Sequence, residues 1–298
     1  MPDLSLWQID FAGVVLGPGT PFIVSDVQGL GAAELRTQDV LNPSDDGAFP
    51  GVDLYASRSV RIEAGISTPG DAEAALNSLA LLEAAADNPE IRRTAGSLAV
   101  LRLCWPGRPT RRLYGRIRRA EAVTTARVIH GWIPLDLEFT ALDPSFNADT
   151  ALGIILSLDS SATREGFTAP VKAPITTGVA SPATRPGWVT NEGNTGAWPS
   201  LRITGPVTHP RVLHVDSGQV LDLDVSLAPG ETLDIETRPG TRWVLRNGSG
   251  NAASALSSVS RLDLFQIPPG RSEIRWTASD YNNTSRLAVT WRSAWTAL

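Results

Sequence analysis

The 298-residue sequence has little of what most catalytic centres are built from. It contains one cysteine, Cys104, and three histidines, His130, His209 and His214. A single cysteine excludes an intrachain disulfide and a zinc site built on cysteines. The sequence has no G-x-S-x-G or H-E-x-x-H motif, and its glycines lack the spacing of a phosphate-binding loop. We therefore expect no catalytic residues, no metal and no cofactor, with Cys104 in the core and the histidines in structural roles.

Long apolar runs and lysine are also scarce. No uninterrupted apolar stretch approaches the ~20 residues of a membrane helix, and the first residues do not resemble a signal peptide. Lys172 is the only lysine among 26 basic residues, and the net charge of −5 is mild. These properties predict a protein made and folded in a cytosol, without membrane insertion and without general binding to nucleic acid.

The first half of the sequence is rich in strand-like segments and contains one helix-like segment. Apolar residues alternate over 59–66, which predicts a strand with one buried face. Ala, Leu and Glu dominate residues 70–87 and predict the helix. Thr68 and Asp71 resemble a capping box at its start. The first domain is therefore expected to span residues 1–150 and to be mostly β.

The second half has a different composition. Residues 151–185 are rich in Pro, Thr, Ser and Gly after a short apolar run, which predicts a linker or extended arm. Short strand-like runs separated by Pro-Gly turns follow over 186–298. The clearest alternation lies at 219–227, where four apolar residues are expected to point to one face. This pattern predicts an all-β sandwich, such as a jelly roll.

Carboxylates and tryptophans are the candidate binding groups of the second domain. If their strands pair, four carboxylates could bind Ca²⁺ or act as glycosidase acids, although their alternation with apolar residues favours a solvated sheet face. Three tryptophans within strand-like runs are expected in the core. Two in polar surroundings, Trp188 and Trp198, are candidates for contact with an external partner such as a sugar ring. The carboxylates are Asp222, Asp224, Asp234 and Glu236, and the predicted core tryptophans are Trp243, Trp276 and Trp291.

Eight arginines lie between Arg102 and Arg127, on both sides of a turn at 106–109. This spacing predicts an arginine-rich hairpin. Its arginines could be plainly exposed, could pair with carboxylates of a neighbouring subunit, or could contact the phosphates of passing DNA.

Several segments, in their order along the chain, resemble the siphovirus distal tail proteins. No single motif is highly specific, but the resemblance covers nearly the whole chain. The segments are Gly29-Leu30, the turn at 45–47 with Gly51, the strand at 58–65, the helix, the basic hairpin, Ala141–Pro144, Asn191–Gly196, Trp198–Gly205 and Ile267–Ile274.

The resemblance implies a split-barrel-like N-terminal domain that assembles into a ring, usually a hexamer, and a galectin-like C-terminal sandwich. It implies a structural protein of the virion tail, made in the cytoplasm of the bacterial host. Its partners would be the tail tube protein and other tail-tip or baseplate proteins, with DNA only as cargo passing through the lumen. The family has no catalytic residues that could be assigned to this sequence.

The ring requires a contact between subunits, and the charges of the first domain offer one. We predict that Arg111, Arg112 and Arg116 of one subunit meet Asp45 and Asp46 of the next. The alternative functions are a carbohydrate-binding protein that uses Trp188 or Trp198 and, less favoured, a glycosidase that uses the acidic sheet face.

Overall fold

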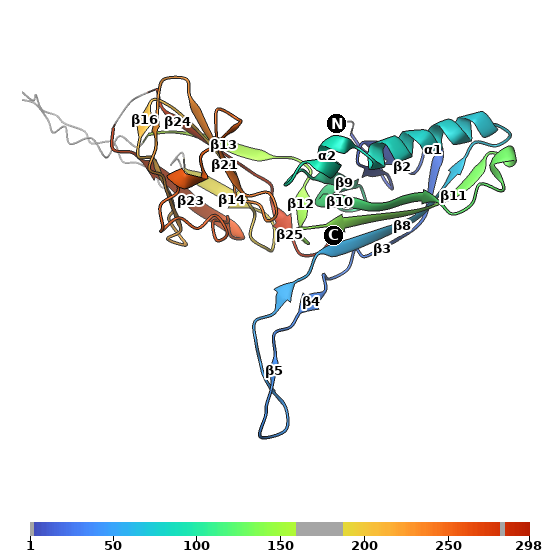
Figure 1. Ribbon diagram of the computed structural model, residues 1–298, viewed down its shortest axis with the longest axis horizontal. Coiled ribbons are helices and arrows are strands. Elements are labelled where there is room, and N and C mark those ends of the chain that lie inside the picture. The colour runs from blue at the N-terminus through green and yellow to red at the C-terminus, as the bar shows by residue number, and fades with distance from the viewer. Residues whose placement is uncertain (1–2, 159–186, 281–283) are drawn as a thin grey trace, which may run out of the picture. The chain divides into compact units, whose positions relative to one another are not determined.

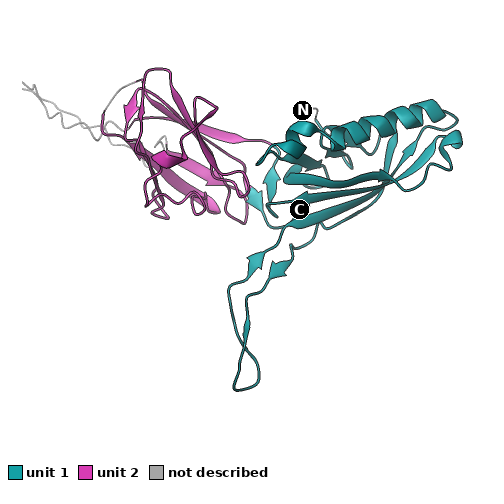
Figure 2. Cartoon of the chain, viewed as in Figure 1, with its two compact units in different colours: residues 1–149, 294–298 teal, residues 150–293 magenta. Residues whose placement is uncertain are grey.

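The computed structural model describes residues 3–158, 187–280 and 284–298. These residues form two compact units (Figure 2). Unit 1 comprises residues 1–149 together with Ala294–Leu298, and unit 2 comprises Thr150–Ser293. The assignment of the last five residues to the second domain is therefore corrected, because they pack with unit 1. In the described part of the chain, no helix is long and apolar enough to cross a membrane.

Unit 1 is built on a nine-stranded sheet whose neighbouring strands are antiparallel. Its strands are β1 (Ile9–Phe11), β2 (Val14–Leu16), β3 (Phe22–Gln28), β8 (Arg58–Ser67), β9 (Ala99–Leu103), β10 (Arg111–Ala122), β11 (Trp132–Ala141), β12 (Phe146–Ala148) and β25 (Ala294–Trp295). The main path runs β2-β1-β9-β10-β11-β8-β3. Strand β12 pairs with β10 and with β25, so the end of the chain completes this sheet.

The alternation predicted over 59–66 is present in β8. Val60, Ile62, Ala64 and Ile66 are buried in the core of unit 1. The opposed residues of β11 are buried as well, because directly opposed residues of an antiparallel pair share a face. They are Phe139, Leu137, Leu135 and Ile133.

The predicted helix is α1 (Ala72–Ala86), which buries Ala75, Leu79 and Leu82 against the sheet (Figure 1). Its N-cap is Asp71, whose carboxylate accepts a hydrogen bond from the backbone N–H of Ala74. The predicted capping box is therefore replaced by a single aspartate cap, while Thr68 donates its hydroxyl to a carbonyl oxygen. A second, short helix, α2 (Pro89–Arg93), follows directly.

A β-hairpin extends from unit 1 between β3 and β8, and we call residues 32–57 the arm (Figure 1). Its four strands pair only with one another. They are β4 (Leu35–Arg36), β5 (Val40–Leu41), β6 (Ala48–Phe49) and β7 (Leu54–Tyr55). Figure 1 shows the arm leaving the sheet on the side away from α1 and α2.

The described residues of unit 2 form two larger sheets and one small one. The six-stranded sheet consists of β13 (Leu152–Ser157), β24 (Arg286–Trp291), β15 (Ser200–Thr204), β20 (Thr232–Glu236), β21 (Trp243–Arg246) and β22 (Gly250–Asn251). The four-stranded sheet consists of β14 (Trp188–Asn191), β23 (Gly270–Thr277), β17 (Arg211–His214) and β18 (Val220–Asp222). The small sheet pairs β16 (Val207–Thr208) with β19 (Ser226–Leu227). The predicted mostly-β class with a C-terminal sandwich is confirmed.

Two segments differ from their predictions. Residues 152–157 of the expected linker form β13, which pairs along its length with β24. The remainder of that linker, 159–185, lies outside the described residues. The alternating run at 219–227 is split between β18 and β19, which belong to different sheets. Leu223 lies at the break, where it forms a bridge with Leu256.

The loop before β11 also differs from its prediction. His130 lies in a short 3-10 helix, η1 (Val128–His130), and not in a strand. Gly131 follows with φ of 74° and approaches the carbonyl oxygen of Thr68 so closely that a Cβ atom would overlap it. Glycine is required here both by the backbone angle and by the close contact. In unit 2 the 3-10 helix η4 (Ala253–Ala255) lies near the break at Leu223.

Candidate assembly interface

The arginine-rich hairpin exists, but its arginines contact groups of their own chain. Strands β9 and β10 form the hairpin. Arg111 is buried, and its guanidinium carbon lies 3.2 Å from the centre of the Trp295 ring. Arg116 donates hydrogen bonds to the carbonyl oxygens of Arg92, Thr94 and Ser97 at 3.1, 2.9 and 3.2 Å. The prediction that these side chains face a neighbouring subunit is therefore corrected.

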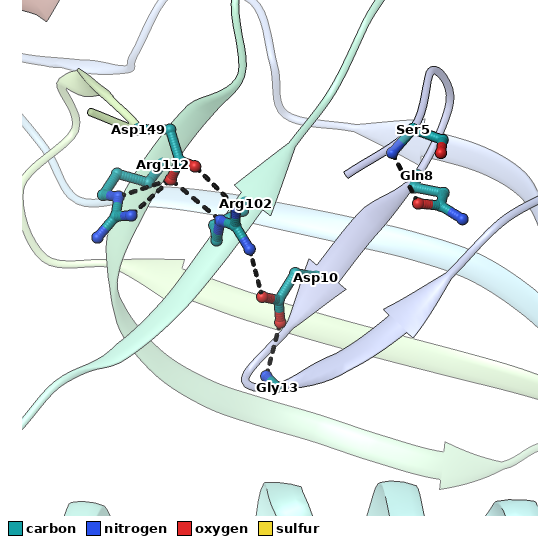
Figure 3. Close-up of polar contacts among 7 residues, drawn as sticks. All are labelled: Ser5, Gln8, Asp10, Gly13, Arg102, Arg112 and Asp149. Atoms are coloured by element: carbon teal, nitrogen blue, oxygen red, sulfur yellow. Dashed lines mark hydrogen bonds and ion pairs between the residues drawn. The ribbon is translucent and has the colours of Figure 1, made fainter. Parts of the chain in front are cut away.

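Arg112 belongs to a buried network of ion pairs (Figure 3). Its Nη2 lies 2.5 Å from Asp149, and Arg102 lies 2.7 Å from the same carboxylate. Arg102 also lies 3.1 Å from Asp10, which accepts a hydrogen bond from the backbone N–H of Gly13 at 2.6 Å. The network therefore joins β1, β9 and β10 to the residue at which the chain leaves unit 1.

Asp149 is the central carboxylate of this network. Burial opposes its ionisation, but hydrogen bonds from Arg102 and Arg112 outweigh burial and lower the pKa of the carboxyl. Both arginines are almost fully enclosed, so their charges need this partner. The network is structural, because all of its partners are supplied by the same chain.

The acidic residues Asp45 and Asp46 have different surroundings. They lie at the end of the arm, in the turn between β5 and β6, and both are exposed. Of the predicted charge contact, the two aspartates are therefore exposed, whereas the arginines contact groups of unit 1.

The arm also exposes many large apolar side chains. Val40 lies opposite Phe49, and Leu35 lies opposite Tyr55, so apolar residues pair across its strands. An isolated two-stranded hairpin is at best marginally stable in water, and clustered exposed apolar residues mark interaction surfaces. The sequence prediction missed this surface. The exposed residues, with 42–80% of their surface accessible, are Leu35, Val40, Leu41, Phe49, Val52, Leu54 and Tyr55.

The base of the arm is fixed by Arg58, the first residue of β8. This side chain is 3% exposed and donates to backbone carbonyl oxygens only. The acceptors come from Gly29 and Gly31 before the arm, from Pro144, and from Thr296 near the end of the chain. Burial lowers the pKa of the guanidinium. The role of Arg58 could not be found from sequence, because its acceptors are backbone atoms of distant segments.

An apolar groove lies next to β3, which is the last strand in the hydrogen-bonded order of the sheet. Its volume is about 700 Å³. The rings of Trp7 and Trp105, which line it, lie 5.9 Å apart, and Asp26 is the one charged residue among the described residues of its lining. An edge strand beside an apolar groove is a second surface at which another chain could add to the sheet.

In unit 2 the candidate external tryptophans already have contacts. Arg271 lies 4.2 Å from the ring centre of Trp188, and Arg242 lies 5.4 Å from that of Trp198. Each ring therefore has a guanidinium over one face. Among the tryptophans predicted in the core, Trp276 and Trp291 are buried, whereas Trp243 is 38% exposed and is corrected.

The carboxylates of unit 2 do not gather into one site. Asp222 lies in the four-stranded sheet and Asp234 in the six-stranded sheet, where Asp234 pairs with Arg202. Asp224 pairs with His209 at 3.1 Å. Within the residues that the structure describes, no group of three or more His, Cys, Asp or Glu side chains could hold a metal ion. Cys104 is buried, as predicted.

Comparison with known proteins agrees with this architecture. Residues 192–295 match the family described as siphovirus-type tail component, C-terminal domain. No curated protein sequence matches the chain.

Two solved structures have a similar fold over nearly the whole length. The SPP1 Dit (gp 19.1) protein, described as a paradigm of the hub adsorption apparatus in phages that infect Gram-positive hosts, is 12% identical, with a TM-score of 0.59 over 97% of this chain and 99% of that chain. A chain of the phage P2 baseplate in its activated conformation with Ca is 11% identical, with a TM-score of 0.55 over 95% of this chain and 97% of that chain. The predicted resemblance is confirmed: residues 192–295 match the siphovirus-type tail component, C-terminal domain, and the chain has a fold similar to that of the SPP1 Dit protein.

Proposed function

We propose that this protein is a structural component of a long-tailed phage tail, in which unit 1 forms a closed ring between the tail tube and the baseplate or fibres. The observation that carries the proposal is the family match over residues 192–295. The similarity of fold to SPP1 Dit across nearly the whole chain supports it. The ring is a hexamer, its further partners are tail tube and baseplate proteins, and the protein is made in the host cytoplasm.

Unit 1 has the features that a ring subunit needs. A closed ring is built from heterologous contacts, in which one surface of a subunit meets a different surface of the next. Unit 1 presents an apolar, acidic arm and, elsewhere, an edge strand and grooves. Exposed apolar area supplies most of the association free energy, and charge mainly sets the register.

The protein has no catalytic role in this proposal. The carboxylates that could have served a glycosidase do not gather in one sheet, since Asp222 and Asp234 lie in different sheets. Asp234 pairs with Arg202, and Asp224 lies 3.1 Å from His209. A carbohydrate-binding role is not favoured either, because arginines already occupy one face of the Trp188 and Trp198 rings.

The experiment is native mass spectrometry and negative-stain electron microscopy of the full chain. A closed ring of six copies with a central hole is expected. The full chain is necessary because a fragment ending near residue 150 lacks β25, which pairs with β12 of unit 1. A protein that stays monomeric at tens of micromolar, an ordinary concentration for a moderate interface, would contradict the ring.

A further inference from the structure

A second groove of unit 1, smaller than the one beside β3, lies where α1, α2 and β10 meet. We call it the basic groove. Its volume is about 250 Å³. Among the described residues that line it, five are apolar, three are arginines and none is a carboxylate. The lining residues are Ala85, Ala86, Ile91, Arg92, Ala99, Arg116, Ile117 and Arg118.

Contacts within the chain fix the residues that line the basic groove. Arg116 donates to three carbonyl oxygens of residues 92–97, so the loop after α2 is fixed against β10. Arg92 pairs with Asp87 at 2.9 Å on the surface. Arg118 lines the groove, and Arg93 follows the lining residue Arg92 at the end of α2. Both are exposed, and no carboxylate in the described part of the chain pairs with either of them. A preformed apolar floor with unpaired positive charge at its rim is suited to an acidic, apolar ligand.

The arm has that chemistry. Residues 32–57 contain five acidic residues and one basic residue, a net charge of −4. The acidic residues are exposed, and two of them, Asp45 and Asp46, lie at the tip. Val40 and Phe49 share one face just behind the tip. Five residues of extended chain span at most about 17 Å. Val40 and Phe49 are therefore close enough to Asp45 and Asp46 for all four side chains to contact the same groove.

The arm leaves the sheet on the side away from α1 and α2 (Figure 1), and residues of both helices line the basic groove. The arm therefore cannot fill the groove of its own subunit. Two different surfaces that fit each other, but not within one molecule, produce a heterologous contact that repeats from copy to copy.

We propose that the arm of each copy docks into the basic groove of a neighbouring copy, with Val40 and Phe49 on the floor and Asp45 and Asp46 against Arg93 and Arg118. The inference rests on the proposed ring and names the contact that closes it. The groove beside β3 is larger, but its only charged lining residue is Asp26, which would repel the arm. Arg93 and Arg118, which pair with no carboxylate among the described residues, take the place of the arginines predicted from sequence to receive Asp45 and Asp46.

The test is a charge exchange in the full chain, read by sedimentation velocity and native mass spectrometry. Asp45→Arg with Asp46→Arg, and separately Arg93→Asp with Arg118→Asp, should each weaken assembly about tenfold or more, because like charges then meet. The combined four-residue variant should recover most of the lost affinity. Arg108→Asp, an exposed arginine in the β9–β10 turn and outside the groove, is the matched control and should leave assembly unchanged.

A second measurement locates the contact. A variant with Phe49→Cys and Ile117→Cys should form a disulfide-linked ladder of more than two copies under mild oxidation, whereas either single variant should give no ladder beyond a dimer. Absence of the ladder, or a four-residue variant as weak as its parents, would overturn the docking while leaving the ring intact. An equal loss in the Arg108→Asp control would do the same. A wild-type protein that never forms rings would overturn the proposed function as well.

Discussion

The β9–β10 hairpin and the arm are both charged hairpins of unit 1, but their side chains have different surroundings. The β9–β10 hairpin lies inside the nine-stranded sheet, where Asp10, Asp149 and Trp295 supply partners for its arginines. The arm pairs only with itself and leaves apolar and acidic side chains exposed. A high density of charged residues in the sequence therefore does not identify an assembly surface. Such a surface is identified by exposed charged and apolar side chains that have no partner among the described residues of the same chain.

The largest effect on stability is expected at the base of the arm, where the exposed hairpin joins the buried sheet. Arg58→Ala should lower the free energy of unfolding of unit 1 by about 3–5 kcal/mol, because several buried carbonyl oxygens lose their donor at once. Urea unfolding of the full chain measures it. Arg127→Ala, an exposed arginine, is the control and should change stability by less than about 0.5 kcal/mol. A comparable loss in both variants would show that the Arg58 contacts do not support unit 1.

The next effect concerns the network behind the arginine-rich hairpin. Asp149→Ala should destabilise unit 1 by about 2–4 kcal/mol, because Arg102 and Arg112 then share an enclosed site without their common carboxylate. Urea unfolding at neutral pH measures the loss. Asp263→Ala, which removes an exposed surface pair with Arg261, should cost far less.

The same carboxylate gives a pH dependence. The pKa of Asp149 is lower in the folded protein than in the unfolded chain, so its contribution is complete above the unfolded pKa of about 3.9. That contribution is lost as the pH falls from about 4 through the lower folded pKa. Stability measured from pH 7 to pH 2 should therefore fall less in Asp149→Ala than in wild type. Parallel curves would indicate that Asp149 has an ordinary pKa.

A smaller effect on stability is expected at the C-terminal residues that pack with unit 1. Trp295→Ala removes the ring that lies 3.2 Å from the guanidinium of Arg111 and should cost about 2 kcal/mol. Trp295→Phe keeps an aromatic face and should cost less. The change should appear in the unfolding transition of unit 1, to which residues 294–298 belong, and a change confined to unit 2 would contradict that assignment.

The smallest effect on stability, and the sharpest contrast, is expected in the arm. Leu41→Ser with Phe49→Ser should change the free energy of unfolding of the dilute protein by less than about 0.5 kcal/mol, because both side chains are exposed. The same variant should weaken assembly, measured by sedimentation velocity. A large loss of stability with unchanged assembly would show that the arm belongs to the core and not to an interface.

The sequence by itself determined the elements with a strong local signal. The alternation of β8, the apolar stripe of α1 and the β9–β10 turn follow from the spacing of residues close together in the chain. The order of these elements was also sufficient for the resemblance to the distal tail proteins. Local periodicity controls these features because a buried face must repeat with the period of its own helix or strand.

The tertiary structure alone decided which charged groups are free. Asp149 lies 37 positions after Arg112, and Thr296 lies 238 positions after Arg58, so no local pattern reveals these contacts. The same limit applies to Asp222 and Asp234, which lie in the four-stranded and six-stranded sheets, because alternation within a strand does not show which strands pair. The partners of a side chain depend on which distant segments the fold brings next to it. The sequence around an arginine therefore does not show whether its side chain is enclosed with a carboxylate or exposed at a groove.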